Sequence, residues 1–573
     1  MTLSLSLQPR LLTPIPTSLS ALPPVLARLY AARGVQHPDE LDLKLSRLLP
    51  AHTLRGLDAA LDRLELALDQ QQRILIVGDF DADGATSTAL MMLALRRMGA
   101  VVDFLVPDRF KYGYGLTPEI VALALQDFAP QVIVTVDNGI SSHAGVEAAH
   151  AAGVEVIITD HHLTSKTVPP ACAVVNPNQP NCAFASKALA GVGVAFYVLA
   201  ALSTRRRNRG LPSAKLTDWL DVVALGTVAD VAPLDANNRI LVAQGVQRIR
   251  SGQCRMGLLA LLEVAGRQPD QLTSQDLGFV LGPRINAAGR MDNMRIGIEC
   301  LLAEDWHSAR ALAVRLDALN AERRSVEADM KNDALALLAE HPLLLTGQLP
   351  HAIVLYEPSW HQGVIGIVAG RLKEQFHRPS IVFAPSDDSA QVLKGSARSI
   401  AGVHIRDAIE RVAEHHDGMI THFGGHAMAA GLTLPAAHLA QFQQAFDAVI
   451  AQHDPALFQP VLLTDGALLD EQLSISFARQ LAEAGPWGQA FPAPVFDGRF
   501  VVLEQRWLKE KHIKWTLRPM TGGQWVEAIW FNVDAHTWPQ DVQQIELAYQ
   551  LDINTFRGEQ RIQLMVQHAS AVA

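Results

Sequence analysis

The stretch ILIVGDFDADGATSTAL (residues 74–90) places Asp79, Asp81 and Asp83 at alternate positions directly after a run of aliphatic residues. The aliphatic run predicts a buried strand, and Gly84 marks the turn into a helix. One aspartate would suffice to cap that helix, because its carboxylate accepts hydrogen bonds from first-turn amides. Three neighbouring carboxylates repel one another unless cations are bound, so the stretch favours a divalent-metal site.

Strand-like and helix-like patterns alternate around this stretch, from about residue 70 to 235. The strand-like runs are RILIVGD, VVDFLVP, QVIVTVDNG and VEVIITDHH. This alternation predicts an α/β fold with a parallel sheet and helices on both faces. Ligands of such sheets bind beyond the carboxyl ends of the strands. We therefore expect Asp137 and the group Asp160, His161 and His162, which end two of these runs, to converge with the three aspartates.

Different patterns follow in the rest of the chain. Residues 306–338 contain no glycine or proline and carry an apolar stripe, which predicts one long connecting helix. A second α/β region follows, and the last part alternates short strands with turns, as in an oligonucleotide-binding (OB)-like β-barrel. The expected organisation is an N-terminal segment with a catalytic domain (1–305), a connector helix (306–342), a second α/β domain (343–457) and an OB-like barrel (458–573).

Composition narrows the class of protein. The 573 residues suit several domains, and 18% charged residues with 49% hydrophobic residues indicate a globular chain. The four cysteines form no CxxC pair, so neither a disulfide framework nor a structural zinc site is indicated. No targeting or membrane-spanning segment is evident, and a cytoplasmic protein is expected. The net charge of -10 argues against a basic nucleic-acid coat but permits phosphate contacts confined to one groove.

Asp230, in ALGTVADVAPL, completes a candidate ligand set of carboxylates with one imidazole. That mixture suits Mn²⁺ or Mg²⁺ better than a zinc site, which would contain cysteines. Its natural use is a centre with two divalent metal ions, in which a bridging carboxylate holds both ions for attack on a phosphoryl group.

The motifs DFDADG, VDNG, DHH and TVADVAPL, in this order, resemble those of the DHH phosphoesterase superfamily, and GGHAMAAG resembles the glycine-rich motif of its companion DHHA1 domain. Together with RFKYGYGL, LGPRINAAGR, HQGVIGIVAGRLK and a C-terminal barrel, they make residues 50–573 similar to the single-stranded-DNA-specific exonucleases of bacteria. The resemblance implies that two metal ions are bound by Asp81, Asp83, Asp137, His161 and Asp230. It further implies that Asp137 bridges the ions and that His162 faces the substrate phosphate. Related small pyrophosphatases carry a ligand histidine where this sequence has Val77, which leaves Asp79 as a substitute ligand.

Further residues are candidates for holding the substrate. Arg284, Asn286 and Arg290 in GPRINAAGR lie among small residues, where a phosphate backbone can approach two guanidinium groups. The alternative is an ordinary surface helix with ion pairs. We favour phosphate binding.

Two other segments are expected to hold the end of the strand. Ser396 and Arg398 have strand spacing and therefore share one face. The resemblance implies that they grip the 5' end of the strand together with Arg109. Tyr114 is expected to stack on a base, and His426 of GGHAMAAG to reach the scissile phosphate.

Six of the nine tryptophans lie in the C-terminal region: Trp487, Trp507, Trp515, Trp525, Trp530 and Trp538. Most are expected to fill the barrel core, with one or two exposed near Lys509, Lys511 and Lys514 as a stacking platform. The basic segment TRRRNRG (204–210) is expected to be a solvated loop.

The resemblance implies a 5' to 3' exonuclease that degrades single-stranded DNA to mononucleotides in DNA repair and recombination. Expected partners are a single-strand-binding protein and a DNA helicase, with the enzyme a monomer. One alternative is a phosphodiesterase for short oligonucleotides or cyclic dinucleotides, although such enzymes usually lack the connector and barrel. A second is a non-catalytic DNA-binding scaffold, which loss of ligand aspartates would mark. A dehydrogenase is disfavoured because GDFDADG lacks the GxGxxG spacing.

Overall fold

The computed structural model describes residues 5–10, 14–164, 167–340, 348–386, 390–533, 538–556 and 558–572, with only the backbone of Arg109, Phe110 and Phe556. The chain forms two compact units. The larger unit contains Pro9–Leu319 and Thr464–Ala573, and the smaller contains Met1–Gln8 and Asn320–Leu463. Among the described helices, none is both long and apolar enough to cross a membrane.

A five-stranded parallel sheet organises the larger unit, as the alternating pattern predicted. Its strands are β2 (Arg73–Gly78), β3 (Val101–Leu105), β4 (Val132–Val136), β5 (Glu155–Thr159) and β6 (Ala173–Val175). The strand order is β3-β2-β4-β5-β6, so the chain reverses its direction of travel across the sheet between β2 and β4. Such a reversal opens a crevice at the carboxyl ends of these two strands.

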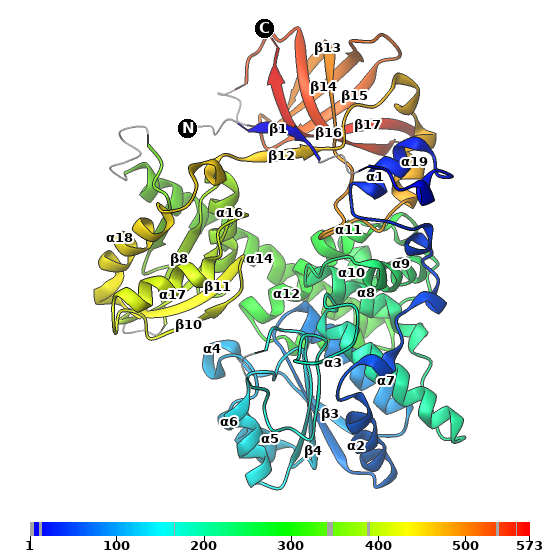
Figure 1. Cartoon of the computed structure of the whole chain (residues 1–573), viewed down its shortest axis with the longest axis vertical. Coiled ribbons are helices and arrows are strands. Elements are labelled where there is room, and N and C mark those ends of the chain that lie inside the picture. The colour runs from blue at the N-terminus through cyan, green and yellow to red at the C-terminus, as the bar shows by residue number, and fades with distance from the viewer. Residues whose placement is uncertain are drawn as a thin grey trace. The chain divides into compact units, whose positions relative to one another are not determined.

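Helices cover both faces of this sheet (Figure 1). Leu75 and Val77 of β2 pack with α5 (Pro118–Asp127) and α6 (His143–Ala151), whereas Ile74 and Ile76 belong to the main core on the opposite face. This alternation follows from the two-residue period of a strand, and burial on both faces explains the continuous aliphatic run. The main core also includes residues of α2 (Leu57–Asp69), α3 (Ala82–Arg97) and α7 (Gly191–Asn208).

Further helices complete the catalytic region: α1 (Pro24–Ala31), α4 (Arg109–Tyr112), α8 (Leu220–Ala229), α9 (Ala236–Arg250), α10 (Met256–Val264), α11 (Ser274–Asp276), α12 (Gly282–Met291) and α13 (Arg295–Leu302). The predicted long helix is α14 (Trp306–Ala339), and the boundary between the two units falls within it.

The prediction of a loop at 204–210 was wrong, because α7 continues to Asn208. Its arginines pair with α2, for example Arg205 with Asp62 and Arg209 with Glu65.

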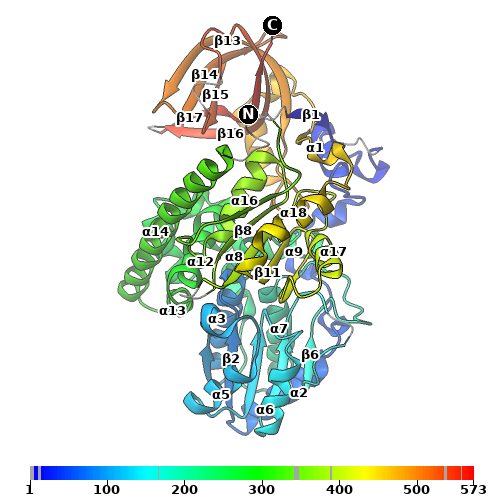
Figure 2. The same ribbon diagram turned by 90° about the vertical axis from the view of Figure 1, so that its left-hand side faces the viewer.

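The smaller unit contains a mixed sheet in the order β10-β11-β9-β8-β7. Its strands are β7 (Ile353–Tyr356), β8 (Ser380–Pro385), β9 (Val392–Arg398), β10 (His422–Gly425) and β11 (Ala429–Pro435), and its helices are α16 (Ile365–Phe376), α17 (Ile405–His415) and α18 (Leu439–Ile450). Figure 2 shows α17 and α18 against the sheet, and residues of both helices share its buried core. Strand β1 (Ser6–Pro9) pairs with β12 (Val461–Thr464).

The C-terminal strands close into the predicted barrel, in the order β13-β14-β15-β17-β16. They are β13 (Phe496–Leu508), β14 (His512–Pro519), β15 (Val526–Phe531), β16 (Gln544–Phe556) and β17 (Glu559–Ala571), preceded by α19 (Ile475–Glu483). Trp515 and Trp538 are buried in the barrel, whereas Trp525 is 52% exposed. The barrel is continuous with the catalytic core, because Arg33 pairs with Asp465 and Leu234 donates its N–H to the Gln489 carbonyl.

Candidate metal centre

The turn after β2 gathers three aspartates at the start of α3. Asp81 is the N-cap, and its Oδ1 accepts hydrogen bonds from the amides of Asp83 (2.9 Å) and Gly84 (3.0 Å). Position 84, in the first turn of α3, requires glycine, because a Cβ there would lie 2.6 Å from the Asp79 carbonyl oxygen. Capping therefore explains Asp81 in part, while its other carboxylate oxygen and the side chains of Asp79 and Asp83 need a further explanation.

Asp83 is held by the N-terminus of α7, which lies more than a hundred residues later in the sequence. Its two carboxylate oxygens accept hydrogen bonds from the amides of Gly191 (2.6 Å) and Val192 (2.8 Å). The helix dipole favours a negative charge at this position. Burial nevertheless raises the pKa of Asp83 to about 7, with a further contribution from the charge of Asp81.

Asp137 follows β4 at the crevice and has an unusual backbone conformation, with φ = 61°. Left-handed backbone is disfavoured for an aspartate and often marks a functional position. Burial, together with the charges of Asp83 and Asp81, raises the pKa of Asp137 well above its ordinary value. The fold therefore buries the Asp137 carboxylate at a place where a proton or a bound cation must neutralise its negative charge.

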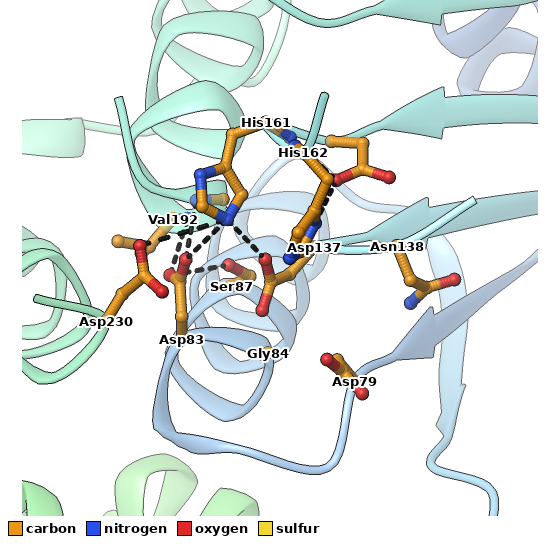
Figure 3. Close-up of polar contacts among 12 residues, drawn as sticks. Asp79, Asp83, Gly84, Ser87, Asp137, Asn138, His161, His162, Val192 and Asp230 are labelled. Carbon is orange, nitrogen blue, oxygen red and sulfur yellow. Dashed lines mark hydrogen bonds and ion pairs between the residues drawn. The ribbon is translucent and has the colours of Figure 1, made fainter. Parts of the chain in front are cut away.

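His161, at the end of β5, lies between three of the carboxylates (Figure 3). Its Nε2 is 3.1 Å from Asp137 Oδ1 and 3.8 Å from oxygens of both Asp83 and Asp230. Burial lowers the pKa of His161 to about 4, so the ring is neutral at physiological pH and keeps a lone pair for a metal. Burial and the charges of Asp83, Asp81 and Asp79 raise the pKa of Asp230, which ends α8.

The donor set fits divalent cations. One group of possible ligand atoms comes from Asp83, His161 and Asp230 and a second from Asp79, Asp81 and Asp137, each within 4.8 Å. Buried Asp137 Oδ1 and His161 Nε2 make no hydrogen bond within the described part of the chain. Two adjacent groups of hard oxygen ligands with an imidazole match Mn²⁺ or Mg²⁺. The structure thus brings together all six predicted ligands.

Asp160 was predicted to converge on the crevice with His161 and His162, but no ligand or substrate role was predicted for it. Its buried carboxylate accepts hydrogen bonds from the amides of Ile140 (2.9 Å), His161 (2.7 Å) and His162 (3.1 Å). It also lies 2.8 Å from His162 Nδ1. Burial would lower the pKa of His162, but the hydrogen bond to Asp160 and its charge outweigh burial and raise it to about 9. His162 is therefore a cation beside the metal ligands.

Tyr114 and Asn286 both support the loops that carry metal ligands. Tyr114 donates its hydroxyl to the Asp137 carbonyl oxygen (3.1 Å) and lies 3.2 Å from His162 Nδ1. Its ring is partly exposed, so a role in base stacking stays a prediction. Asn286 Oδ1 accepts the Ala82 amide (2.9 Å) and thereby links α12 to the loop after β2. The motif that suggested phosphate binding thus contributes to the shape of the metal site.

The other predicted substrate residues lie in three places. Arg284 pairs with Asp317 of α14 (2.9 Å) and donates a hydrogen bond to the Val280 carbonyl. This ion pair is what the alternative interpretation, a surface helix with ion pairs, predicts. Arg290 lies further along α12. Their phosphate contacts stay predictions. Ser396, Arg398 and His426 belong to the smaller unit, which contains none of the six metal ligands. The side chain of Arg109 lies outside the described residues.

Comparison with known proteins agrees with this geometry. The chain matches sequence profiles of the DHH family N-terminal domain over residues 73–227, the DHHA1 domain over residues 349–452 and the RecJ OB domain over residues 464–568. These matches define a DHH-type hydrolase with its companion domain.

Relatives identify the family more narrowly. The chain is 53% identical to the single-stranded-DNA-specific exonuclease RecJ of Dickeya dadantii over 97% of both chains, and 51% identical to that of Escherichia coli over 96% of both. It also resembles the crystal structure of Thermus thermophilus RecJ in complex with Mn²⁺, with a TM-score of 0.80 and 32% identity, covering 99% of this chain and 79% of the other. The chain belongs to the RecJ family.

Proposed function

We propose that this protein is a metal-dependent exonuclease that hydrolyses single-stranded DNA. The observation that carries the proposal is the set of five buried or half-buried carboxylates and one neutral imidazole at the carboxyl edge of the sheet, in a chain of the RecJ family. Phosphodiester hydrolysis is the reaction for which paired divalent ions held by carboxylates are suited. Asp79, Asp81, Asp83, Asp137, His161 and Asp230 would hold Mn²⁺ or Mg²⁺.

The chain's own residues have separate tasks in this reaction. Bound divalent ions supply Lewis acidity and a nucleophile at neutral pH. The α7 amides fix Asp83, and Asp160 fixes His161 and His162 through their backbone amides. His162, kept cationic by Asp160, can donate a hydrogen bond to a phosphate oxygen and stabilise charge that develops there.

A 5' to 3' direction, with release of mononucleotides, follows if the smaller unit anchors the 5' end. Ser396 and Arg398 share one face of β9, and Arg398 Nη1 donates to Ser396 Oγ (3.2 Å). The N-terminal turn of α16 covers them closely, since a Cβ at Gly366 would lie 2.7 Å from Ser396 Oγ and 2.9 Å from Arg398 Nη2. An arginine, a hydroxyl and a helix N-terminus together form a suitable phosphate site.

Single-stranded DNA must be supplied to such an enzyme by strand separation. We therefore propose that it acts in the cytoplasm, in DNA repair and recombination, after a helicase and on strands that carry a single-strand-binding protein. We further propose that the enzyme acts as a monomer.

Single strands labelled at the 5' or the 3' end test the reaction and its direction. With Mn²⁺ or Mg²⁺, the 5' label should appear at once as a mononucleotide, whereas the 3' label should stay on progressively shorter strands. Asp137→Ala should abolish hydrolysis while leaving the fold intact by circular dichroism. Immediate release of the 3' label would reverse the proposed direction, and a rate with Asp137→Ala near that of the natural chain would contradict the assigned site.

A further inference from the structure

Helix α8 ends in a strained turn directly after the candidate ligand Asp230. Val231 has φ = 59°, although a β-branched residue is a genuine outlier in left-handed backbone. The Val231 amide donates a hydrogen bond to the Val228 carbonyl (3.1 Å), and the Ala232 amide donates to the Thr227 carbonyl (3.2 Å). This pattern is a Schellman motif, in which glycine is the usual residue at the position that Val231 occupies. The turn would therefore be less strained with glycine.

Burial of the Val231 side chain does not offset this strain, since the residue is 61% exposed. Backbone strain of this kind clusters at functional sites, where a side chain is needed at a fixed place. Val231 adjoins Asp230, whose carboxylate faces His161 in the metal centre (Figure 3). The position of Val231 therefore suits contact with a molecule bound at that centre.

A second exposed apolar side chain lies on the segment that packs against the end of α8. Phe279 is 82% exposed and belongs to the π-helix Leu277–Leu281 (η7), which leads into α12. This π-helix lies close to α8, because a Cβ at Gly278 would lie 3.2 Å from Val228 Cγ1. Short π-helices of this kind are rare and frequently mark functional sites. One exposed phenylalanine would need no explanation, but here two irregular segments in mutual contact each expose an apolar side chain.

Resting on the function proposed above, we propose that Phe279 and Val231 contact a nucleobase of the single strand that is hydrolysed. A strand cut at the metal centre places a phosphate near Asp230, and the bases of the flanking nucleotides lie one sugar away from it. The ring of Phe279 would stack on a base, and the isopropyl group of Val231 would pack against the adjoining sugar. Every base has a π-face that accepts stacking without sequence preference. Because a base inside a duplex is already stacked on its neighbours, this contact favours an unpaired strand.

Hydrolysis kinetics with Mn²⁺ and two matched strands test the proposal. One strand contains only thymidine, and the other has the same sugar-phosphate backbone with abasic sugars in place of all bases. Phe279→Ala should raise KM for the thymidine strand by about tenfold with little change in kcat, because stacking stabilises the ground state and the transition state about equally. Phe279→Trp should restore the natural KM, since it keeps a stacking ring. The inhibition constant of the abasic strand should be the same for Phe279→Ala and the natural chain.

Val231→Gly distinguishes a contact with DNA from a structural role. Glycine relieves the left-handed strain, so this variant should have a higher Tm than the natural chain. Its KM for the thymidine strand should nevertheless rise by about threefold, because the apolar contact is lost. The matched control is Ala129→Gly, at an exposed residue with φ = 44° that precedes β4 and so lies at the amino end of that strand. This control relieves the same kind of strain and should leave KM unchanged.

Stabilisation by Mn²⁺ should be the same in the natural chain and in all four variants, because no substitution alters a metal ligand. An unchanged KM for the thymidine strand in either Phe279→Ala or Val231→Gly would overturn the proposal. An equal loss of affinity for the abasic strand would also overturn it, since the contact would then be to the backbone. Weaker stabilisation by Mn²⁺ would show that the variants act through Asp230, with the same consequence. If the natural chain hydrolysed no single strand, the proposed function would fail, and this contact with it.

Discussion

Individual aspartates at the metal centre serve both as structural groups and as candidate ligands. Asp81 caps α3 with one oxygen, and Asp83 accepts two amides from α7. Helix capping and metal binding are therefore not exclusive interpretations of this stretch. Because backbone amides fix these carboxylates before a metal arrives, little side-chain ordering remains for binding itself.

The metal ligands could be predicted from the sequence because each lies at a recognisable place, at a strand end or in a family motif. The residues that orient them could not all be found in this way. Asp83 is held by Gly191 and Val192, and Asn286 holds the Ala82 amide, although these partners are far apart in the sequence. Only the tertiary fold brings them together. The position of Asp160 at the crevice was predicted, but its role in orienting His161 and His162 was not.

The pKa of Asp83 leads to a prediction about pH. Burial raises the pKa of Asp83 from 3.8 to about 7. At pH values between these two, the metal-free folded state therefore binds more protons than the unfolded state. The contribution of this group to stability therefore falls as pH rises through that range. Metal binding releases the proton and should be favoured by rising pH. Thermal unfolding with and without Mn²⁺ should show a larger stabilisation at about pH 7.5, above this pKa, than at about pH 5.5, below it. A pH-independent stabilisation would contradict this assignment.

Gly191 leads to a prediction about packing. A Cβ at this position would lie 2.7 Å from Asp137 Cβ and 2.8 Å from its Oδ1. Gly191→Ala should therefore displace the Asp137 carboxylate and lower nuclease activity by about a hundredfold. The control is Gly370→Ala in α16, where a Cβ meets no atom within 4 Å. It should retain activity and gain about 0.5–1 kcal/mol of stability. Full activity of Gly191→Ala would show that the site tolerates the displacement.

At the level of helices and strands, the elements of the parallel sheet could be predicted because its strands are short aliphatic runs and its helices have clear periodicity. The segment 204–210 was predicted wrongly because six polar residues in succession, 204–209, resemble a loop. In the structure, α7 continues through the arginines, since Arg205, Arg206 and Arg209 pair with carboxylates of α2. Ion pairs with a distant helix leave no local signal in the sequence.

The barrel strands separate buried from exposed aromatic residues and allow a test of DNA binding. Trp525 and Phe531 are 52% and 45% exposed, whereas Trp515 is fully buried. Trp525→Ala and Phe531→Ala should each weaken the binding of long single strands by about 1–3 kcal/mol through lost base stacking. Anisotropy of a labelled strand without divalent metal measures this. Leu503→Ala, another exposed position, is the control. If both aromatic variants bound DNA as the natural chain does, the barrel would not be a stacking platform.

For the whole molecule, the four predicted parts fold as two compact units. The barrel shares its unit with the catalytic domain through contacts such as Tyr30 to the Ala484 carbonyl and Arg33 to Asp465. Such contacts between segments more than four hundred residues apart are not visible in sequence patterns. Deleting the barrel would therefore expose part of the catalytic core, and single surface substitutions are the better test of its role.

The division into units also separates the metal ligands from the proposed end-binding residues, so each can be altered without the other. Arg398 is half of the proposed phosphate site on β9, and burial lowers the pKa of its guanidinium. A half-buried guanidinium is stabilised by an anionic partner, which a 5'-phosphate would supply. Arg398→Ala should raise KM for 5'-phosphorylated strands by about tenfold with little change in kcat, because the contact holds the ground state and the transition state about equally.

Strands with a 5'-phosphate or a 5'-hydroxyl should therefore become nearly equal substrates for Arg398→Ala, whereas the natural chain should prefer the phosphate. Arg411→Ala, an exposed arginine of α17 in the same unit, should keep that preference. Stabilisation by Mn²⁺ should be the same in all three proteins, because the six metal ligands belong to the other unit. Suppose that Arg398→Ala retained the full preference for a 5'-phosphate while Mn²⁺ still stabilised the variant. The proposed metal centre would then remain supported, but the proposed role of β9 in binding the 5' end would be wrong.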